Sequence, residues 1–160
     1  MAIEKVKEYL KQFGAEGRIR ELEESSATVD LAAHALGVVG ARIAKSLSVW
    51  AGEQPVLIVM AGDVKLHNGK FKALFHFKPH MLTVEEALQY TGHAVGGVCP
   101  FALTTDIPVY LDESLKRFET VFPACGSSNS AIELTLAELE TFSGAKGWVD
   151  VTAPKQTETK

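Results

Sequence analysis

The fold of this chain is decided by one apolar run, Pro55-Val56-Leu57-Ile58-Val59-Met60-Ala61. A proline stands at its start and Gly62 follows its end, and both residue types are typical of strand boundaries. The run contains no polar residue, whereas a strand with one face in water alternates polar and apolar positions. It therefore predicts a central strand that is buried on both faces.

Helices are expected on both sides of this run. Residues 2–13 carry apolar side chains at helical spacing, and Ser or Thr residues at 25–28 offer N-caps for a second helix that Gly37 ends. A third helix is expected to begin near Asn68, with a hairpin turn at Asn68-Gly69 as the alternative. Thr83 and Thr135 each stand three residues before a glutamate, a capping-box pattern that predicts helices to about residues 90 and 142.

The remaining apolar segments predict short strands at 18–23, 45–50, 107–111, 120–124, 131–134 and 148–151. Strands in mixed order with helices between them indicate a mixed α/β fold, with a curved, largely antiparallel mixed sheet covered by helices. We expect a single domain over residues 1–153. The polar tail, residues 154–160, is expected to be disordered.

Composition narrows the class of protein. The chain has 160 residues, 46% hydrophobic and 22% charged, which is typical of one globular domain. Its longest apolar run is too short to span a bilayer, and its first residues lack the apolar core of a signal peptide. The two cysteines, Cys99 and Cys125, form no C-x-x-C pair, as expected in a reducing compartment. We therefore expect a cytoplasmic protein without a membrane partner.

Charge limits the contact with nucleic acid. The net charge is −4, whereas a protein that grips a long phosphate backbone usually has a basic surplus. One segment, Val64 to Met81, has no acidic residue and carries Lys65, Lys70 and Lys72. It is either a solvated helix face or a local contact for nucleic acid.

A glycine-rich stretch follows the fourth predicted helix: Gly92-His93-Ala94-Val95-Gly96-Gly97-Val98-Cys99-Pro100-Phe101-Ala102-Leu103. Adjacent glycines let the backbone come close to a ligand, and a proline stiffens the loop. Exposed amides in such a loop can hold an ester carbonyl, a carboxylate or a phosphate. The stretch does not match a nucleotide-binding fingerprint, and a tight turn without a ligand remains an alternative.

Few side chains are candidates for chemistry. The Cys and His residues show no recognised zinc spacing, so we expect no metal and no other cofactor. Cys99 with His93 as base is conceivable, but packing is the better interpretation of both cysteines. Lys45 stands at the start of a half-buried strand, where a partly desolvated ammonium could bind an oxyanion or a phosphate. The alternative is a lysine that extends to solvent.

Five pieces of the chain, in this order, resemble the YbaK/prolyl-tRNA synthetase-associated domain family, which includes EbsC-like and ProX-like proteins. They are Ala32-Ala33 leading to Gly37; Ile43-Ala44-Lys45-Ser46-Leu47; Leu57 to Met60 ending in Ala61-Gly62-Asp63; Thr91-Gly92 leading to Gly96-Gly97-Val98-Cys99-Pro100-Phe101; and Val109 to Leu115. The resemblance covers roughly residues 18–150. It implies a YbaK-like α/β domain that hydrolyses the ester of mischarged aminoacyl-tRNA.

The resemblance also implies roles for individual residues. Lys45 matches the family's functional lysine, near the aminoacyl ester and the terminal adenosine. The implied substrate-binding residues lie on the helix bordering the pocket and on two loops: Thr28, Ala32, Gly96, Gly97, Val98, Pro100, Gly126, Ser127, Ser128 and Asn129. The Ser-Ser-Asn sequence after Gly126 departs from the Gly-Arg-rich form of YbaK, which leaves the substrate amino acid open.

The leading hypothesis is a deacylase acting in trans on aminoacyl-tRNA that carries a small amino acid, Cys, Ala, Ser or Thr, with tRNA(Pro) as one potential tRNA. Loop amides and Lys45 could suffice for an activated ester, with water or a substrate group as nucleophile. Lys65, Lys70 and Lys72 would contact the tRNA, and a synthetase is a second potential partner. The alternatives are a non-catalytic tRNA- or synthetase-binding module and a site for a small free ligand.

Overall fold

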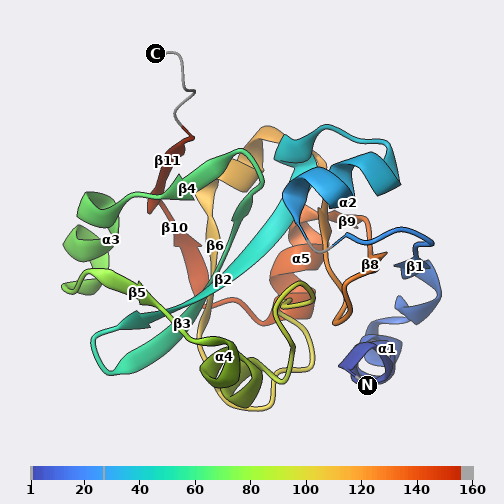
Figure 1. Cartoon of the computed structure of the whole chain (residues 1–160), viewed down its shortest axis with the longest axis horizontal. Coiled ribbons are helices and arrows are strands. Elements are labelled where there is room, and N and C mark those ends of the chain that lie inside the picture. The colour runs from blue at the N-terminus through green and yellow to red at the C-terminus, as the bar shows by residue number, and fades with distance from the viewer. Residues whose placement is uncertain (1, 27, 156–160) are drawn as a thin grey trace.

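The computed structural model describes residues 2–26 and 28–155. Its main sheet contains strands β2 (Ile43–Ala51), β3 (Gln54–Ala61), β5 (Pro79–Met81), β6 (Val109–Asp112), β7 (Thr120–Pro123), β9 (Leu134–Thr135) and β10 (Gly147–Val149). Their order is β10-β6-β3-β2-β7-β9, and β5 also pairs with β2. The sheet is strongly curled (Figure 1). Among the described residues this sheet has three antiparallel and three parallel strand pairs, and two further antiparallel pairs lie outside it, so the expected mixed α/β fold is confirmed.

Strand β3 lies at the centre of this sheet, as its apolar sequence predicts. It pairs antiparallel with β2 from Ala44↔Ala61 to Ala51↔Gln54, and parallel with β6 on its other edge. Every residue from 55 to 61 is buried. Full burial of a side chain such as Leu or Ile contributes about 1.5–3 kcal/mol, so this strand is a major source of stability.

Helices cover the sheet at its ends and over its faces (Figure 1): α1 (Ala2–Leu10), α2 (Val29–Leu36), α3 (Asn68–Phe75), α4 (Val84–Thr91) and α5 (Leu136–Ser143). Both expected capping boxes form, Thr83 with Glu86 and Thr135 with Glu138. The Thr28 hydroxyl caps α2 by accepting the Leu31 N–H. The helices expected from these local patterns are therefore confirmed.

The structure corrects several expectations. Two small antiparallel ladders join β1 (Arg20–Glu21) to β8 (Ser130–Ala131) and β4 (Val64–Leu66) to β11 (Thr152–Pro154). The basic segment is therefore not one helix face, because β4 and β5 flank α3. The strand expected at 131–134 is divided between β8 and β9.

The chain also stays ordered beyond residue 153. Pro154 pairs with Val64, and the Lys155 N–H donates to the Asp63 carbonyl at 3.1 Å. The expected disordered tail, 154–160, therefore starts too early, because its first two residues are tied to β4 and the loop before it. Residues 156–160 lie outside the described residues.

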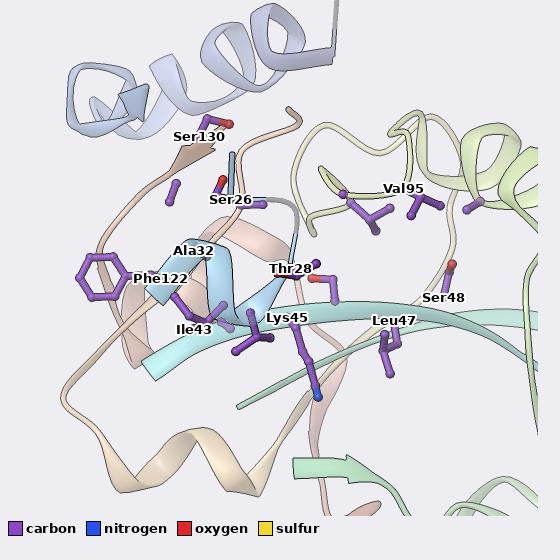
Figure 2. Close-up of a pocket in the computed structure, with 18 of the residues that line it drawn as sticks. Ser26, Thr28, Ala32, Ile43, Lys45, Leu47, Ser48, Val95, Phe122 and Ser130 are labelled. Carbon is purple, nitrogen blue, oxygen red and sulfur yellow. The ribbon is translucent and has the colours of Figure 1, made fainter. Parts of the chain in front are cut away.

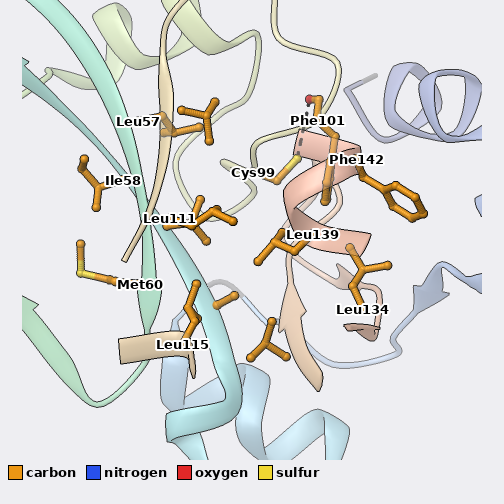
Figure 3. Close-up of a cluster of buried hydrophobic side chains, with 14 of the residues drawn as sticks. Leu57, Ile58, Met60, Cys99, Phe101, Leu111, Leu115, Leu134, Leu139 and Phe142 are labelled. Carbon is orange, nitrogen blue, oxygen red and sulfur yellow. Dashed lines mark hydrogen bonds between the residues drawn. The ribbon is translucent and has the colours of Figure 1, made fainter. Parts of the chain in front are cut away.

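The main core lies on both faces of β3 and includes side chains of α1, α3 and α5; one part of it lies between the sheet and the helices α1 and α5. Leu57 and Leu111 project to this side of the sheet, where they meet Leu134, Leu139 and the glycine-rich stretch (Figure 3). A second, smaller cluster lies under α2, and it joins Ala32 and Leu36 to Ile43 of β2 and Phe122 of β7. The two clusters leave a space along β2 between them.

Candidate active site

A cavity of about 290 Å³ lies along the outer edge of β2, the edge that faces away from β3 (Figure 2). One wall comes from α2 and the segment before it, the floor from residues 43–48 of β2, and the other wall from α4 and the glycine-rich stretch. Small side chains recur in its lining, among them Ala32, Ala44, Ala87, Ala124 and Ala131. These small side chains leave the space beside β2 open.

The cavity exists because the sheet is interrupted at this edge. Strand β2 pairs with β7 through Ile43 and Ala44 only, and with β5 from Val49 to Ala51 only. Among the described residues, no strand pairs with the interval between these two ladders on that edge. Loops rather than a strand face the interval, so the cavity opens directly onto the backbone of β2.

Lys45 lies in this interval. Its side chain points to the opposite side of β2 from Ser48 and Val95, and its Nζ donates to the carbonyl of Val64 (Figure 2). Burial, together with the nearby Lys155, lowers the pKa of Lys45 to about 8, while the Asp63 charge acts in the opposite direction.

Asp63 does not neutralise Lys45 fully, because its carboxylate is already engaged. The two terminal guanidinium nitrogens of Arg117 donate to it, Nη1 at 3.0 Å and Nη2 at 2.6 Å. This pairing also holds the pKa of Asp63 below its usual range. A half-buried ammonium without a dedicated carboxylate can bind an anionic ligand.

Two of the expected substrate-binding residues lie on the α2 side of the cavity. Thr28 and Ala32 both line it. The Thr28 hydroxyl oxygen accepts the Leu31 N–H at 3.2 Å, which fixes the helix start against the cavity. Because Ala32 has only a methyl side chain, the helix can pack close to β2 without filling the space.

Only some residues of the glycine-rich stretch line the cavity. Gly96 and Val98 line the cavity, and Gly96 has a φ of 96°, a conformation that a residue with a side chain rarely adopts. Gly97 instead faces away: its N–H donates to the Ala94 carbonyl at 2.9 Å, so that amide is not available to a ligand. Pro100 is buried and does not line the cavity.

The second loop expected to bind substrate, residues 126–129, packs against the glycine-rich stretch that forms one wall of the cavity. A Cβ on Gly97 would lie 2.8 Å from the Ser127 nitrogen and 2.9 Å from the Gly126 carbonyl carbon, so the two loops are in backbone contact. Gly126, Ser127, Ser128 and Asn129 do not line the cavity.

Hydrogen bonds explain what this second loop holds. The Ser128 carbonyl accepts from the N–H and the hydroxyl of Ser26, and the Asn129 side chain donates to the Leu22 carbonyl. The loop thereby ties down the segment that leads into α2. Its next two residues, Ser130 and Ala131, are the ones that reach the cavity.

Cys99 and His93 form a buried packing pair. His93 Nε2 lies 2.7 Å from the Phe101 carbonyl, to which it donates, and 3.5 Å from Cys99 Sγ. Burial raises the pKa of the Cys99 thiol to about 12, so the reactive thiolate is suppressed. This agrees with packing as the role of Cys99, and within the described residues no group of three or more potential metal ligands gathers.

The three expected tRNA-binding lysines lie outside the cavity. Lys65 is exposed on β4, the strand whose Val64 carbonyl holds the Lys45 ammonium, and Lys72 is exposed on α3. Lys70 instead has local partners: its Nζ lies 3.1 Å from the Asp150 carboxylate and 2.8 Å from the Thr152 carbonyl.

Sequence reasoning missed the serines of the site. Ser46, Ser48 and Ser130 line the cavity, and Ser48 is buried with 6% of its surface exposed. In sequence, the alternation of serine with apolar residues in β2 is typical of a strand face in water. The only signal was weak: serine is small and neutral, whereas solvent faces are usually rich in charged residues.

The fold and the cavity define a small α/β domain with a ligand-sized pocket and a half-buried lysine. The family described as "Aminoacyl-tRNA editing domain" matches residues 23–142, and the chain belongs to this family. Residues 2–26 and 28–155 contain no helix that is long and apolar enough to span a membrane.

Three proteins illustrate the relationship. The chain is 55% identical to the uncharacterized protein YwhH of Bacillus subtilis, covering 94% of this chain and 97% of YwhH. It is 30% identical, over 69% of each chain, to EbsC of Enterococcus faecalis, a protein named as a candidate Cys-tRNA(Pro)/Cys-tRNA(Cys) deacylase. It also matches the crystal structure of a candidate trans-editing enzyme for prolyl tRNA synthetase, with a TM-score of 0.85 and 31% identity over 95% of this chain and 97% of the other.

Proposed function

We propose that this protein is a deacylase that acts in trans and hydrolyses mischarged aminoacyl-tRNA carrying a small amino acid. The observation that carries the proposal is the cavity of about 290 Å³ with Lys45 at its floor. Family membership supports an aminoacyl-tRNA as the substrate, and the names of two relatives make tRNA(Pro) the first tRNA to test.

The lining favours Cys, Ala, Ser or Thr over larger amino acids. Its alanines and serines leave room for a side chain of a few atoms, and Val98 and Phe122 limit that room. A pocket of this kind discriminates poorly between groups that differ by one methylene, so we expect several small amino acids to be accepted.

The reaction requires no strong base, because an aminoacyl ester is already activated. With water as nucleophile, its oxygen adds to the ester carbonyl carbon, and the bond from that carbon to the ribose oxygen breaks. The ribose oxygen then takes up the proton that the water loses. The protein contributes by positioning the ester and stabilising the negative charge that develops on the carbonyl oxygen.

Lys45 is proposed to bind an anionic oxygen of the substrate. Its ammonium extends toward β4, away from Ser48 and Val95, which favours a phosphate of the acceptor end as its ligand (Figure 2). Lys65 on the same strand would continue this contact along the tRNA. The pocket would then hold the aminoacyl group while the lysines hold the nucleic acid.

The test is deacylation of tRNA(Pro) charged with Cys, Ala, Ser, Thr or Pro. Wild type should hydrolyse one or more of the small aminoacyl esters, and Lys45→Ala should reduce kcat/KM about a hundredfold to a thousandfold. Lys11→Ala is the matched control, because Lys11 is an exposed lysine paired only with Glu8 in the described structure. No hydrolysis by wild type would favour the non-catalytic binding module, and equal rates for wild type and Lys45→Ala would refute the role of the lysine.

A further inference from the structure

The open edge of β2 presents the backbone of a single residue to the cavity. The β7 ladder ends at Ala44, and on the β5 side the first contact is the Leu82 N–H, which donates to the Ser48 carbonyl at 3.1 Å. In a strand, the N–H and C=O groups of successive residues point to alternate edges. Since Ala44 and Ser48 point to the outer edge, Ser46 between them points there too.

The hairpin between β2 and β3 leads to the same assignment. Ala51 and Gln54 close a two-residue turn, and such turns are flanked by a hydrogen-bonded pair. Counting back in steps of two assigns Lys45, Leu47 and Val49 to hydrogen bonds with β3. Ser46, opposite Val59, is therefore a non-hydrogen-bonded position of that ladder, with its backbone groups directed to the cavity.

Ser46 also has an unsatisfied side chain. Its Oγ is buried and has no hydrogen-bond partner within the described residues. No hydrogen bond from residues 2–26 or 28–155 reaches its N–H or C=O at the outer edge either. Buried polar groups are normally paired, and leaving one unpaired is costly, so this site is prepared for a ligand with complementary groups.

We propose that the Ser46 edge binds the aminoacyl group as a strand would bind one more residue. The α-amino group of the substrate donates to the Ser46 carbonyl, and the ester carbonyl oxygen accepts the Ser46 N–H. An aminoacyl ester carries its amino and carbonyl groups on one α-carbon, which is the arrangement found in an antiparallel hydrogen-bonded pair. A one-residue gap in the pairing of β2 thus matches a one-residue ligand.

This inference rests on the proposed function and adds a specificity to it. The site recognises an α-amino acid ester, and an acyl ester without the amino group leaves the Ser46 carbonyl unpaired. It also gives the Ser46 N–H a catalytic position, because that group points at the oxygen on which negative charge develops. The small residues of the cavity then surround the side chain of the bound amino acid.

The first experiment compares two substrates with wild-type protein: alanyl-tRNA(Pro) and propionyl-tRNA(Pro), which lacks only the α-amino group. We expect kcat/KM for the propionyl ester to be lower by about tenfold to a hundredfold, the usual effect of leaving one buried polar group unpaired. Equal values for the two substrates would overturn the proposal.

Two variants separate the backbone from the side chain. Ser46→Pro removes the N–H at the outer edge without removing a hydrogen bond to β3, and should reduce kcat/KM for alanyl-tRNA about a hundredfold. Ser46→Ala removes only the hydroxyl and should keep the preference for alanyl over propionyl ester. Circular dichroism checks that both variants fold, and a folded Ser46→Pro variant with wild-type activity would contradict the inference.

A binding measurement distinguishes failure of this inference from failure of the proposed function. The probe is 3′-alanylamido-3′-deoxyadenosine, a stable amide analogue of the charged acceptor end, with its propionyl counterpart as control. We expect the alanyl compound to shift the Ser46 amide resonance in NMR spectra and to bind about tenfold more tightly, whether or not the protein hydrolyses tRNA esters. Saturation of the cavity without a shift at Ser46, or no binding, would refute the Ser46 site.

Discussion

Strands β2 and β3 are antiparallel neighbours of almost equal length, but they differ in burial and in where their second edges are paired: β3 pairs with β6 in its middle, at Leu57 to Val59, whereas β2 pairs with β7 and β5 only near its two ends. β3 is paired by β2 on one side and by β6 on the other, and it is buried from residue 55 to residue 61. The outer edge of β2 loses its partners between Ala44 and Ser48, and the cavity with Lys45 and Ser46 lies there. The candidate site therefore lies where the outer edge of β2 has no strand partner.

The full burial of β3 predicts a high cost of substitution in this strand. Leu57→Ala in β3 removes a completely buried side chain and should lower the free energy of unfolding by about 2–5 kcal/mol. Leu88→Ala on α4 is the control, since Leu88 is 52% exposed, and should change it by less than about 0.5 kcal/mol. Urea denaturation measures both, and similar losses would show that β3 does not dominate stability.

The packing of the two loops beside the unpaired part of β2 can be disrupted at Gly97. Gly97→Ala places a methyl group against the backbone of Gly126 and Ser127, and should cost about 1–3 kcal/mol in stability because backbone must move. Gly17→Ala is the matched control, because its Cβ would meet nothing within 4 Å. Thermal unfolding compares the two, and a Gly97→Ala variant as stable as wild type would mean that the loops separate freely.

The lowered pKa of Lys45 predicts that substrate binding depends on pH. With a pKa of about 8, Lys45 is charged below pH 8 and neutral above it, so anion binding should weaken as pH rises. Between pH 7 and pH 9 its charged fraction falls about tenfold, and KM for the aminoacyl-tRNA should rise to a similar extent. Lys45→Arg keeps its charge over this range and should flatten the profile; parallel profiles would contradict this assignment.

The smallest expected effects concern the lysines beyond the pocket. Lys65→Glu and Lys72→Glu should each weaken tRNA binding several-fold and reduce its salt dependence by about one unit per lost phosphate contact. Lys70→Glu should affect tRNA binding less, because Lys70 is held by Asp150 and the Thr152 carbonyl. Filter binding at several salt concentrations measures how strongly each variant weakens tRNA binding. Unchanged binding in all three variants would exclude the surface that carries Lys65, Lys70 and Lys72 as a tRNA contact.

Local sequence signals predicted a large part of the fold. The Thr83 and Thr135 capping boxes, the Thr28 cap and the apolar run of β3 each depend on residues within a few positions of one another. Such interactions form in almost any context, so they can be predicted from sequence. The strands β4 and β5 could not, because three residues become a strand only where a partner strand is available.

Only some of the residues expected at the candidate site line the cavity. Thr28, Ala32, Lys45, Gly96 and Val98 were expected at the substrate and do line the cavity. Gly97, Pro100 and residues 126–129 lie behind its wall, because backbone packing between two loops that are distant in sequence decides which residue faces inward. The expected roles of all these residues in binding substrate are still predictions.

The sequence by itself therefore determined the central strand, the helix caps and a lysine next to a small-residue pocket. Only the tertiary structure decided that the outer edge of β2 has no strand partner at Ser46 and that the Lys45 ammonium points to β4. The physical reason is the range of the interactions. A cap or an apolar run is a property of adjacent residues, whereas a missing partner is a property of strands and loops brought together from the whole chain.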